Sequence, residues 1–234
     1  MQESETRIEG IKDYIETLFG AEDPDLKWVR QNCIDNHLPM INVPPHVGKL
    51  LYILTKIKSP KRVLEIGTLG GYSTLWLAKA LKKEAKIVSI DLEEHHLKLA
   101  KMHADHCQLS HKIEFIKGHA IEILDQMIIE NHEKFDLIFI DADKENYMNY
   151  LTKVQKLANE EALILSDNLI PKWKAIGKPH PKDEMAKSIY AFNESLVLDP
   201  NLDSAIISTL VGEIPRIDGL GISIFRSIKE DKIL

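Results

Sequence analysis

The chain has 234 residues, 44% of them hydrophobic, and its 30 basic against 36 acidic residues give a formal net charge of −6 at pH 7. The length permits one sizeable hydrophobic core, and the acidic balance argues against nucleic acid as a general electrostatic partner. The polar N-terminus and the lack of a long apolar run argue against a signal peptide and a membrane partner, so we expect a cytoplasmic protein.

Three helices are predicted before the first strand, at Arg7–Leu18, Asp25–Asn36 and Pro45–Lys56, because their apolar residues recur at helical spacing. No stretch has the composition of a linker, so we expect one domain over residues 1–234, made of a helical cap (1–58) and an α/β core (59–234). The cap precedes the sheet and is expected either to cover a ligand or to meet a second subunit. We therefore expect a homodimer.

The stretch Lys61–Ser73 reads as a strand, a tight glycine-containing turn and the start of a helix. Glycines at 67, 70 and 71 allow a ligand to approach the backbone, and the start of the following helix offers free N–H groups. The dinucleotide fingerprint Gly-x-Gly-x-x-Gly is not matched. A carboxylate at Glu65, just before the turn, would repel a pyrophosphate but attract a ligand with an ammonium or sulfonium group. This favours S-adenosylmethionine over NAD(H).

From Lys61 onward, strands alternate with helices, which is typical of a parallel sheet covered on both faces. The last two apolar runs are short and close together, so they are expected to pair as an antiparallel hairpin. An α/β fold with a seven-stranded, mostly parallel sheet is predicted. After the first strand, the predicted elements are strand Lys86–Asp91, helix Glu93–Cys107, strand Lys112–Lys117, helix Ile121–Glu130, strand Phe135–Ile140, helix Lys144–Leu157, strand Ala162–Ser166, helix Lys182–Leu198 and strands Asp203–Leu210 and Gly219–Arg226.

Polar residues stand where these strands end, at the edge where open parallel sheets bind their ligands. Asp91 lies 26 residues after Glu65, where a carboxylate can accept hydrogen bonds from both ribose hydroxyls. By itself Asp91 would fit equally well as a helix N-cap. Its combination with Glu65 and the glycines favours the ribose role.

Three hard oxygen ligands follow neighbouring strands at Asp141, Asp167 and Asn168. Such a set suits Mg²⁺ or Ca²⁺. On spacing alone the commoner explanation is structural, with Asp141 as a helix cap and Asp167-Asn168 as a turn.

Three segments together resemble a known family. Leu64–Ser73, Phe139–Tyr147 (Phe-Ile-Asp-Ala-Asp-Lys-Glu-Asn-Tyr) and Ser166–Asn168 are similar to the signatures of the cation-dependent O-methyltransferases. These are the caffeoyl-CoA O-methyltransferase group, with catechol O-methyltransferase more distant. The similarity extends from about Val43 to Arg226, and the Asp-Ala-Asp-Lys run strengthens the metal interpretation.

The resemblance implies a Rossmann-like class I methyltransferase that moves a methyl group from S-adenosylmethionine to a hydroxyl of a small aromatic, catechol-like acceptor. It implies a divalent cation, with Mg²⁺ expected and Mn²⁺ or Ca²⁺ as alternatives. Two alternatives remain open from the residues themselves, a nicotinamide-dependent oxidoreductase and a non-catalytic interaction protein with a nucleotide-binding fold. The implied residues are Val43, Glu65, Gly67, Thr68, Ser73, Asp91, Ala120 and Asp143 for the cofactor, Asp141, Asp167 and Asn168 for the metal, and Lys144 as general base beside Asp141.

Some features depart from the family pattern or carry weaker signals. Relatives usually have a hydroxyl-bearing pair where this chain has Val43-Pro44, and the turn Glu213–Gly219 looks longer than theirs. The loop Ile170–Lys182 is rich in Pro and Lys. It is a candidate wall for the substrate, with Trp173 stacking on an aromatic acceptor, although a solvated loop explains its lysines better. The identity of the acceptor is left open.

Overall fold

A computed structural model describes residues 2–171, 179–180, 182–212 and 215–226. Its centre is a seven-stranded sheet with the order β3-β2-β1-β4-β5-β7-β6. β3, β2, β1, β4 and β5 pair in parallel, whereas β7 is antiparallel to both β5 and β6. The strands are β1 (Arg62–Ile66), β2 (Lys86–Asp91), β3 (Ile113–Lys117), β4 (Phe135–Ile140), β5 (Ala158–Ser166), β6 (Leu202–Val211) and β7 (Arg216–Phe225).

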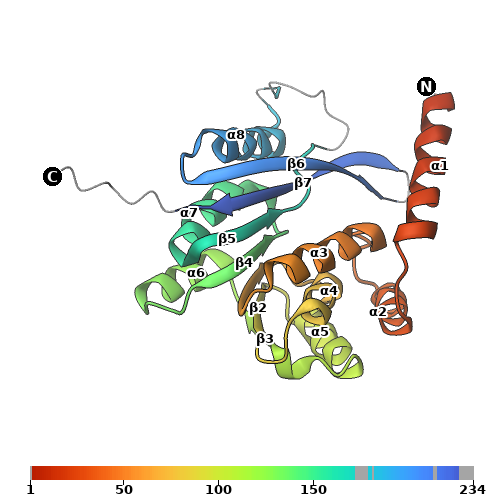
Figure 1. Ribbon diagram of the computed structural model, residues 1–234. Helices are drawn as coiled ribbons and strands as arrows, with labels where there is room; N and C mark the ends of the chain where they lie inside the picture. The colour runs from red at the N-terminus through yellow and green to blue at the C-terminus, as the bar shows by residue number, and fades with distance from the viewer. Residues whose placement is uncertain (1, 172–178, 181, 213–214, 227–234) are drawn as a thin grey trace.

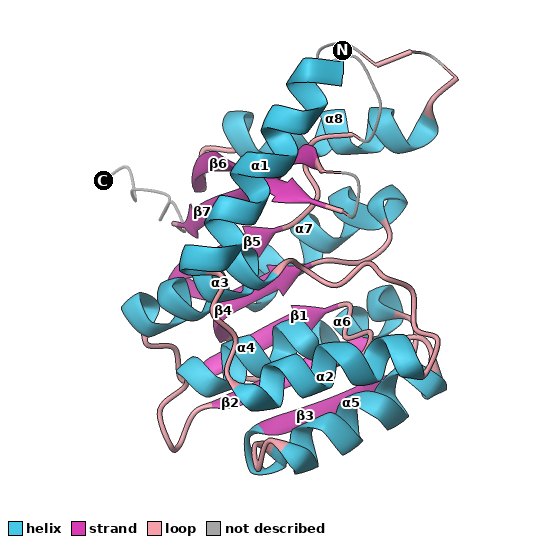
Figure 2. Cartoon of the chain, turned by 90° about the vertical axis from the view of Figure 1, so that its right-hand side faces the viewer, coloured by secondary structure: helices cyan, strands magenta, loops and turns pink. Residues whose placement is uncertain are grey.

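Helices cover both faces of this sheet, as Figures 1 and 2 show from two sides. The first helix, α1, stands at the edge of the molecule, and α2 lies outside α4 and α5. The helices are α1 (Gln2–Phe19), α2 (Pro24–Asp35), α3 (Pro45–Lys58), α4 (Tyr72–Ala80), α5 (Glu94–His106), α6 (Ala120–Ile129), α7 (Tyr147–Leu157) and α8 (Glu184–Leu198), with short 3₁₀ turns at Ser110–Lys112 and Lys144–Asn146.

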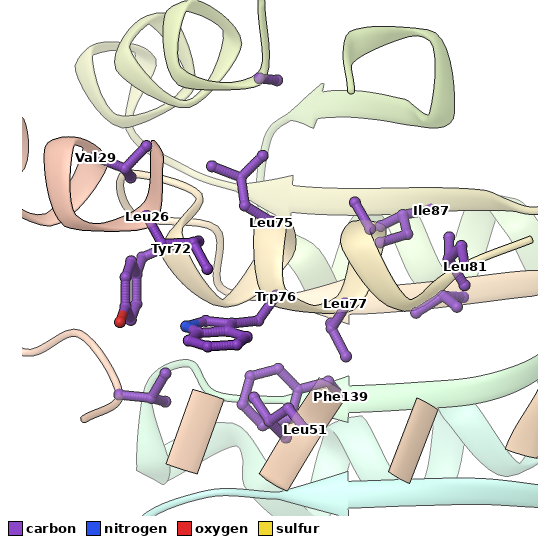
Figure 3. Close-up of a cluster of buried hydrophobic side chains, with 14 of the residues drawn as sticks. Leu26, Val29, Leu51, Tyr72, Leu75, Trp76, Leu77, Leu81, Ile87 and Phe139 are labelled. Atoms are coloured by element: carbon purple, nitrogen blue, oxygen red, sulfur yellow. The ribbon is translucent and has the colours of Figure 1, made fainter. Parts of the chain in front are cut away.

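Each face of the sheet has its own hydrophobic core. On one face, Trp76 and Leu77 of α4 belong to the same buried cluster as Leu51 of α3 and Phe139 of β4 (Figure 3). On the other face, Tyr147 and other buried residues of α6, α7 and α8 pack on β1, β4 and β5. Successive side chains of a central strand point to opposite faces of the sheet. Because helices bury both faces, nearly every residue of these strands is apolar.

The register of the parallel strands aligns their carboxyl ends in one row. Ile66 pairs with Ile140 of β4 and with Ile90 of β2, and Ile140 pairs with Ser166 of β5. The residues immediately after these four positions therefore stand side by side at the carboxyl edge of the sheet. They are Gly67, Asp91, Asp141 and Asp167.

The predicted α/β fold is confirmed, with the seven strands and the terminal hairpin. Several boundaries differ from the prediction, with α1 beginning at Gln2 rather than Arg7 and β7 at Arg216 rather than Gly219. Two further differences have a local structural reason. β5 begins at Ala158 rather than Ala162, because the polar residues after Ala158 hid a strand that is irregular there, with Glu161 at a φ of 61°. The helix predicted from Lys144 begins as a 3₁₀ turn and becomes α-helical at Tyr147.

Among the described residues, none of the helices combines the length and the apolar character needed to cross a lipid bilayer.

Candidate active site

A cavity of about 740 Å³ opens at the carboxyl ends of β1, β2 and β4. Most of the residues predicted for the site line it together, although they come from six separate segments of the chain. Two predicted residues, Glu65 and Asp167, are not in its walls and are nearly or fully buried. The predicted residues in the walls are Val43, Gly67, Thr68, Ser73, Asp91, Ala120, Asp141, Asp143, Lys144 and Asn168.

The glycine turn after β1 is in close contact with the loop after β4. Gly67 has a φ of 101°, and a Cβ atom added there would lie 2.0 Å from the carbonyl oxygen of Asp141. A side chain at this position would therefore both strain the backbone and push the two loops apart. Gly67 brings the predicted cofactor loop against the predicted metal loop.

Asp91 organises the same turn through its carboxylate. Its Oδ2 accepts hydrogen bonds from the backbone N–H groups of Thr68 (3.1 Å) and Leu69 (2.7 Å). Its Oδ1 accepts one from Glu93 N (2.9 Å) and lies 3.0 Å from His96 Nδ1. The carboxylate thus fixes the turn and presents an acceptor to the cavity. The alternative of a helix N-cap was wrong, because the N-cap of α5 is Glu93, and the N–H group there from which Asp91 accepts is that of Glu93 itself.

Glu65 lies behind the turn, with none of its surface exposed. Its carboxylate accepts hydrogen bonds from the hydroxyls of Ser73 (2.7 Å), Ser89 (2.6 Å) and Thr74. Burial raises the pKa of Glu65 to about 7, and the three hydroxyl groups oppose that shift. Because Ser73 lines the cavity and Glu65 does not, any contact of Glu65 with a ligand in this geometry passes through Ser73.

The three predicted metal ligands are close together. Asp167 is buried, and its pKa is raised to about 8 by burial and by the neighbouring carboxylate of Asp141. Its Oδ1 atom has no hydrogen-bond partner among the described residues. Two carboxylates that repel each other, one with an unpartnered buried oxygen, form the donor set that a hard divalent cation would stabilise. The amide oxygen of Asn168 would complete it.

Lys144 stands beside this set. Its Nζ donates hydrogen bonds to Asp141 Oδ1 (3.1 Å) and to the hydroxyl of Tyr147 (2.6 Å). The Tyr147 hydroxyl in turn donates to the carbonyl oxygen of Asp167 (2.8 Å). The ammonium group is therefore held between the two loops that carry the carboxylates.

Asp143 and Ala120 also line the cavity. Asp143 accepts hydrogen bonds from Tyr150 OH and Asn146 Nδ2, so its carboxylate is oriented by α7 and the turn before it. Ala120 is the first residue of α6, where backbone N–H groups are free. The two residues thus contribute backbone donors and an oriented acceptor to the cavity.

Two positioning contacts were not predicted from the sequence. Asp218 of β7 is fully buried, and its Oδ2 accepts from Asn168 Nδ2 at 3.2 Å, which orients the amide oxygen of Asn168 away from Asp218. Tyr147 was part of the family-like segment but was assigned no role. The sequence does carry one signal for Asp218, because an aspartate within a mostly apolar strand indicates a buried carboxylate that needs a partner.

A larger, mainly apolar cavity of about 1010 Å³ lies beside α8 and β6. Its walls contain none of the predicted cofactor or metal residues. Of the predicted substrate wall Ile170–Lys182, positions 172–178, which include Trp173, and position 181 lie outside the described residues, as do positions 213 and 214 of the predicted long turn. The described residues of that loop line this larger cavity, and they are Ile170, Pro171, Pro179, His180 and Lys182.

Comparison with known proteins gives consistent matches along the chain. A family model described as O-methyltransferase matches residues 17–214. A protein named catechol O-methyltransferase from Niastella koreensis is 32% identical over 219 residues, which cover 94% of this chain and 98% of that protein. One with the same name from Mycobacterium tuberculosis is 30% identical, covering 86% and 89% of the two chains.

Solved structures agree with the sequence matches. An O-methyltransferase from Bacillus cereus, crystallised in complex with SAH, superimposes with a TM-score of 0.86 at 32% identity, covering 94% of this chain and 100% of that one. An O-methyltransferase of tomaymycin synthesis from Streptomyces achromogenes, in complex with SAM, also gives a TM-score of 0.86, at 29% identity and with 95% and 99% coverage.

Proposed function

The chain belongs to the O-methyltransferase family, and we propose that it methylates a hydroxyl of a small aromatic, catechol-like acceptor with the help of a divalent cation. The family resemblance seen in the sequence is confirmed, and S-adenosylmethionine is the methyl donor of this family. The observation that carries the finer proposal is the buried Oδ1 of Asp167, which has no hydrogen-bond partner in the described part of the chain and neighbours Asp141, a residue of the cavity wall.

We assign the methyl donor to the side of the cavity formed by the glycine turn. Gly67, Thr68 and Ser73 would contact its amino-acid end, and Asp91 would accept hydrogen bonds from the ribose hydroxyls. The adenine would lie by Ala120, with Val43 and Asp143 closing the pocket. Glu65 supports this arrangement through Ser73.

We assign the cation to Asp141, Asp167 and Asn168, whose oxygens fit Mg²⁺, with Mn²⁺ or Ca²⁺ as alternatives. S-adenosylmethionine supplies an electrophilic methyl group on a positively charged sulfur, and the cation supplies charge that stabilises an ionised phenolic oxygen. Two adjacent hydroxyls on one ring are the acceptor chemistry that such a cation binds best.

Lys144 is placed to take the proton of the acceptor hydroxyl. Its Nζ lines the cavity side of Asp141 and is held by the Tyr147 hydroxyl. A lysine acts as a base only in its neutral form, and a cation at the adjacent carboxylates would favour that form. Asp141 would then both bind the cation and orient the base.

Family membership favours this reading over the nicotinamide oxidoreductase. The remaining alternative, an interaction protein without catalysis, is an outcome of the test below. A cytoplasmic location and a homodimer remain part of our proposal.

The test is a methyl-transfer assay that measures S-adenosylhomocysteine formation on catechol and caffeic acid, with EDTA and after re-addition of Mg²⁺, Mn²⁺ or Ca²⁺. The parent, Asp141→Asn and the exposed control Asp13→Asn are compared. We expect activity in the parent and in Asp13→Asn that EDTA abolishes and Mg²⁺ restores, and none in Asp141→Asn. Undiminished activity in EDTA would remove the cation from the reaction, and cofactor binding without transfer to any diphenol would favour the non-catalytic alternative.

A further inference from the structure

His103 of α5 is a fully buried histidine that lies outside the cavity. Its Nδ1 is 2.7 Å from the carbonyl oxygen of Gly70, in the glycine turn, and its Nε2 is 2.8 Å from the side-chain oxygen of Asn32 on α2. A carbonyl oxygen only accepts hydrogen bonds, so Nδ1 is the donor to Gly70 and Nε2 of the neutral imidazole is an acceptor. We therefore assign the amide nitrogen of Asn32, rather than its oxygen, to the position that faces Nε2, and Asn32 donates this hydrogen bond. One imidazole therefore joins the turn, α5 and α2.

The α2 side of this contact is also well defined. Asn36 Nδ2 donates to the backbone oxygen of Asn32 (2.9 Å) and lies 3.1 Å from the Asn32 side-chain amide. The next residue of α2, Cys33, packs directly on the turn, since a Cβ atom added at Gly70 would lie 2.4 Å from its Sγ. Cys33 of α2 thus contacts the glycine turn directly, whereas Asn32 is connected to it through His103.

His103 holds Gly70, and the position of Gly70 affects the geometry of the cavity. Leu69, immediately before Gly70, has a φ of 47°, a conformation that a leucine keeps only when its neighbours restrain it. The N–H groups of Leu69 and Thr68 are the donors to Asp91. If Gly70 moves, those two donors move relative to the carboxylate that we assign to the ribose.

We propose that His103 is a positioning residue for the methyl-donor site, holding the glycine turn in its binding geometry by donating from Nδ1 to the Gly70 carbonyl and connecting that turn to α2 through Asn32. The inference rests on the proposed function, because it takes the cavity to be the donor site. His103 itself touches neither donor nor acceptor.

Two substitutions separate the two hydrogen bonds. In His103→Asn, the amide nitrogen is attached to Cγ, as Nδ1 is in histidine. The hydrogen bond to the Gly70 carbonyl is therefore kept, and the one to Asn32 is lost. In His103→Gln, the amide oxygen can take the place of Nε2 and accept from Asn32, so the opposite bond is kept. His106→Asn, a partly exposed histidine at the end of the same helix, is the matched control.

The measurements are the Kd of S-adenosylhomocysteine by calorimetry, the KM for the methyl donor, kcat at saturating donor, and the melting temperature of each variant. Losing a buried hydrogen bond to Gly70 should weaken binding and raise KM about tenfold in His103→Gln, with kcat changed less than about twofold. His103→Asn should stay within about threefold of the parent, and His106→Asn should match it. Asn32→Ala, which leaves the core histidine in place, should weaken binding about threefold.

Equal Kd values for the parent, His103→Gln and Asn32→Ala would overturn the inference, even if the variants melt at lower temperatures, since that is the pattern of a purely structural histidine. Similar weakening in His103→Asn and His103→Gln would also overturn it, because the bond to Gly70 would then not be the one that matters. A parent that binds no S-adenosylhomocysteine would instead remove the proposed function, and this inference with it.

Discussion

Glu65 shows how a buried charge prepares a site without entering it. Its pKa is raised from 4.5 to about 7 because burial disfavours the carboxylate. The folded state therefore binds this proton more tightly than the unfolded state. The contribution of Glu65 to stability is fully present below pH 4.5 and is lost as the pH rises through about 7.

The substitution Glu65→Gln tests that reasoning in the cofactor-free protein. Because the amide cannot ionise, the free energy of unfolding of the variant relative to the parent should rise by about 3 kcal/mol between pH 4.5 and pH 8. Thermal or urea unfolding at a series of pH values measures it. Parallel stability curves for the two proteins would show that Glu65 does not titrate in this range.

Lys144 carries the proton-transfer step of the proposal. Lys144→Met keeps most of the aliphatic side chain but removes the base, so kcat should fall about 10²- to 10⁴-fold while the Kd of S-adenosylhomocysteine changes little. Steady-state kinetics at saturating methyl donor measure this. Lys98→Met, an exposed lysine of α5, is the control and should keep parental kcat. A Lys144→Met variant with parental kcat would show that another group takes the proton.

At the scale of elements, the site depends on the packing of the β1–α4 turn against the loop after β4. Gly67→Ala would place a Cβ atom 2.0 Å from the Asp141 carbonyl oxygen at a φ of 101°. We expect a loss of about 2–4 kcal/mol in the free energy of unfolding together with weaker binding of both donor and cation, because both loops must move.

Gly10→Ala is the matched control, because a Cβ atom at Gly10 would meet nothing within 4 Å and the residue lies within α1. That change should be neutral or should raise stability by up to about 1 kcal/mol. Denaturant unfolding and calorimetry compare the two variants. Parental binding in a folded Gly67→Ala protein would contradict the proposed role of this contact.

The elements that build the cavity could be predicted from the sequence because the signals are local. The alternation of apolar, strand-like runs with runs of helical spacing located the strands and helices. The glycine turn after β1 and the polar residues at the ends of β2, β4 and β5 identified the cavity edge. The contacts that orient those residues could not be predicted in the same way. His103 and Asn32 are 71 positions apart, and Asn168 and Asp218 are 50 apart, so only the packed fold shows that they meet.

Helix α1 lies at the edge of the molecule (Figure 2) and exposes apolar side chains. Four of its large side chains are 44–63% exposed, and they are Ile11, Tyr14, Leu18 and Phe19. Such an exposed patch is typical of an interface, and it supports the proposed homodimer. We expect a dimer by sedimentation, and Tyr14→Glu with Leu18→Glu should yield a folded monomer. A monomeric parent at micromolar concentration would contradict this.

At the scale of the whole molecule, the fold brings the ends of several parallel strands to one cavity. One side has a glycine turn and the carboxylate of Asp91, and the other has two carboxylates, an amide and a lysine. The central claim is that a sulfonium donor and a cation-bound phenolic acceptor meet between these two sides.

The most direct test is the crystal structure of the protein with S-adenosylhomocysteine, catechol and Mn²⁺, read by the anomalous scattering of manganese. The account predicts an anomalous peak about 2.1–2.3 Å from oxygens of Asp141, Asp167 and Asn168, with the catechol oxygens on the same ion and the sulfur facing them. A peak elsewhere, or S-adenosylhomocysteine bound outside the cavity at Gly67, would contradict it.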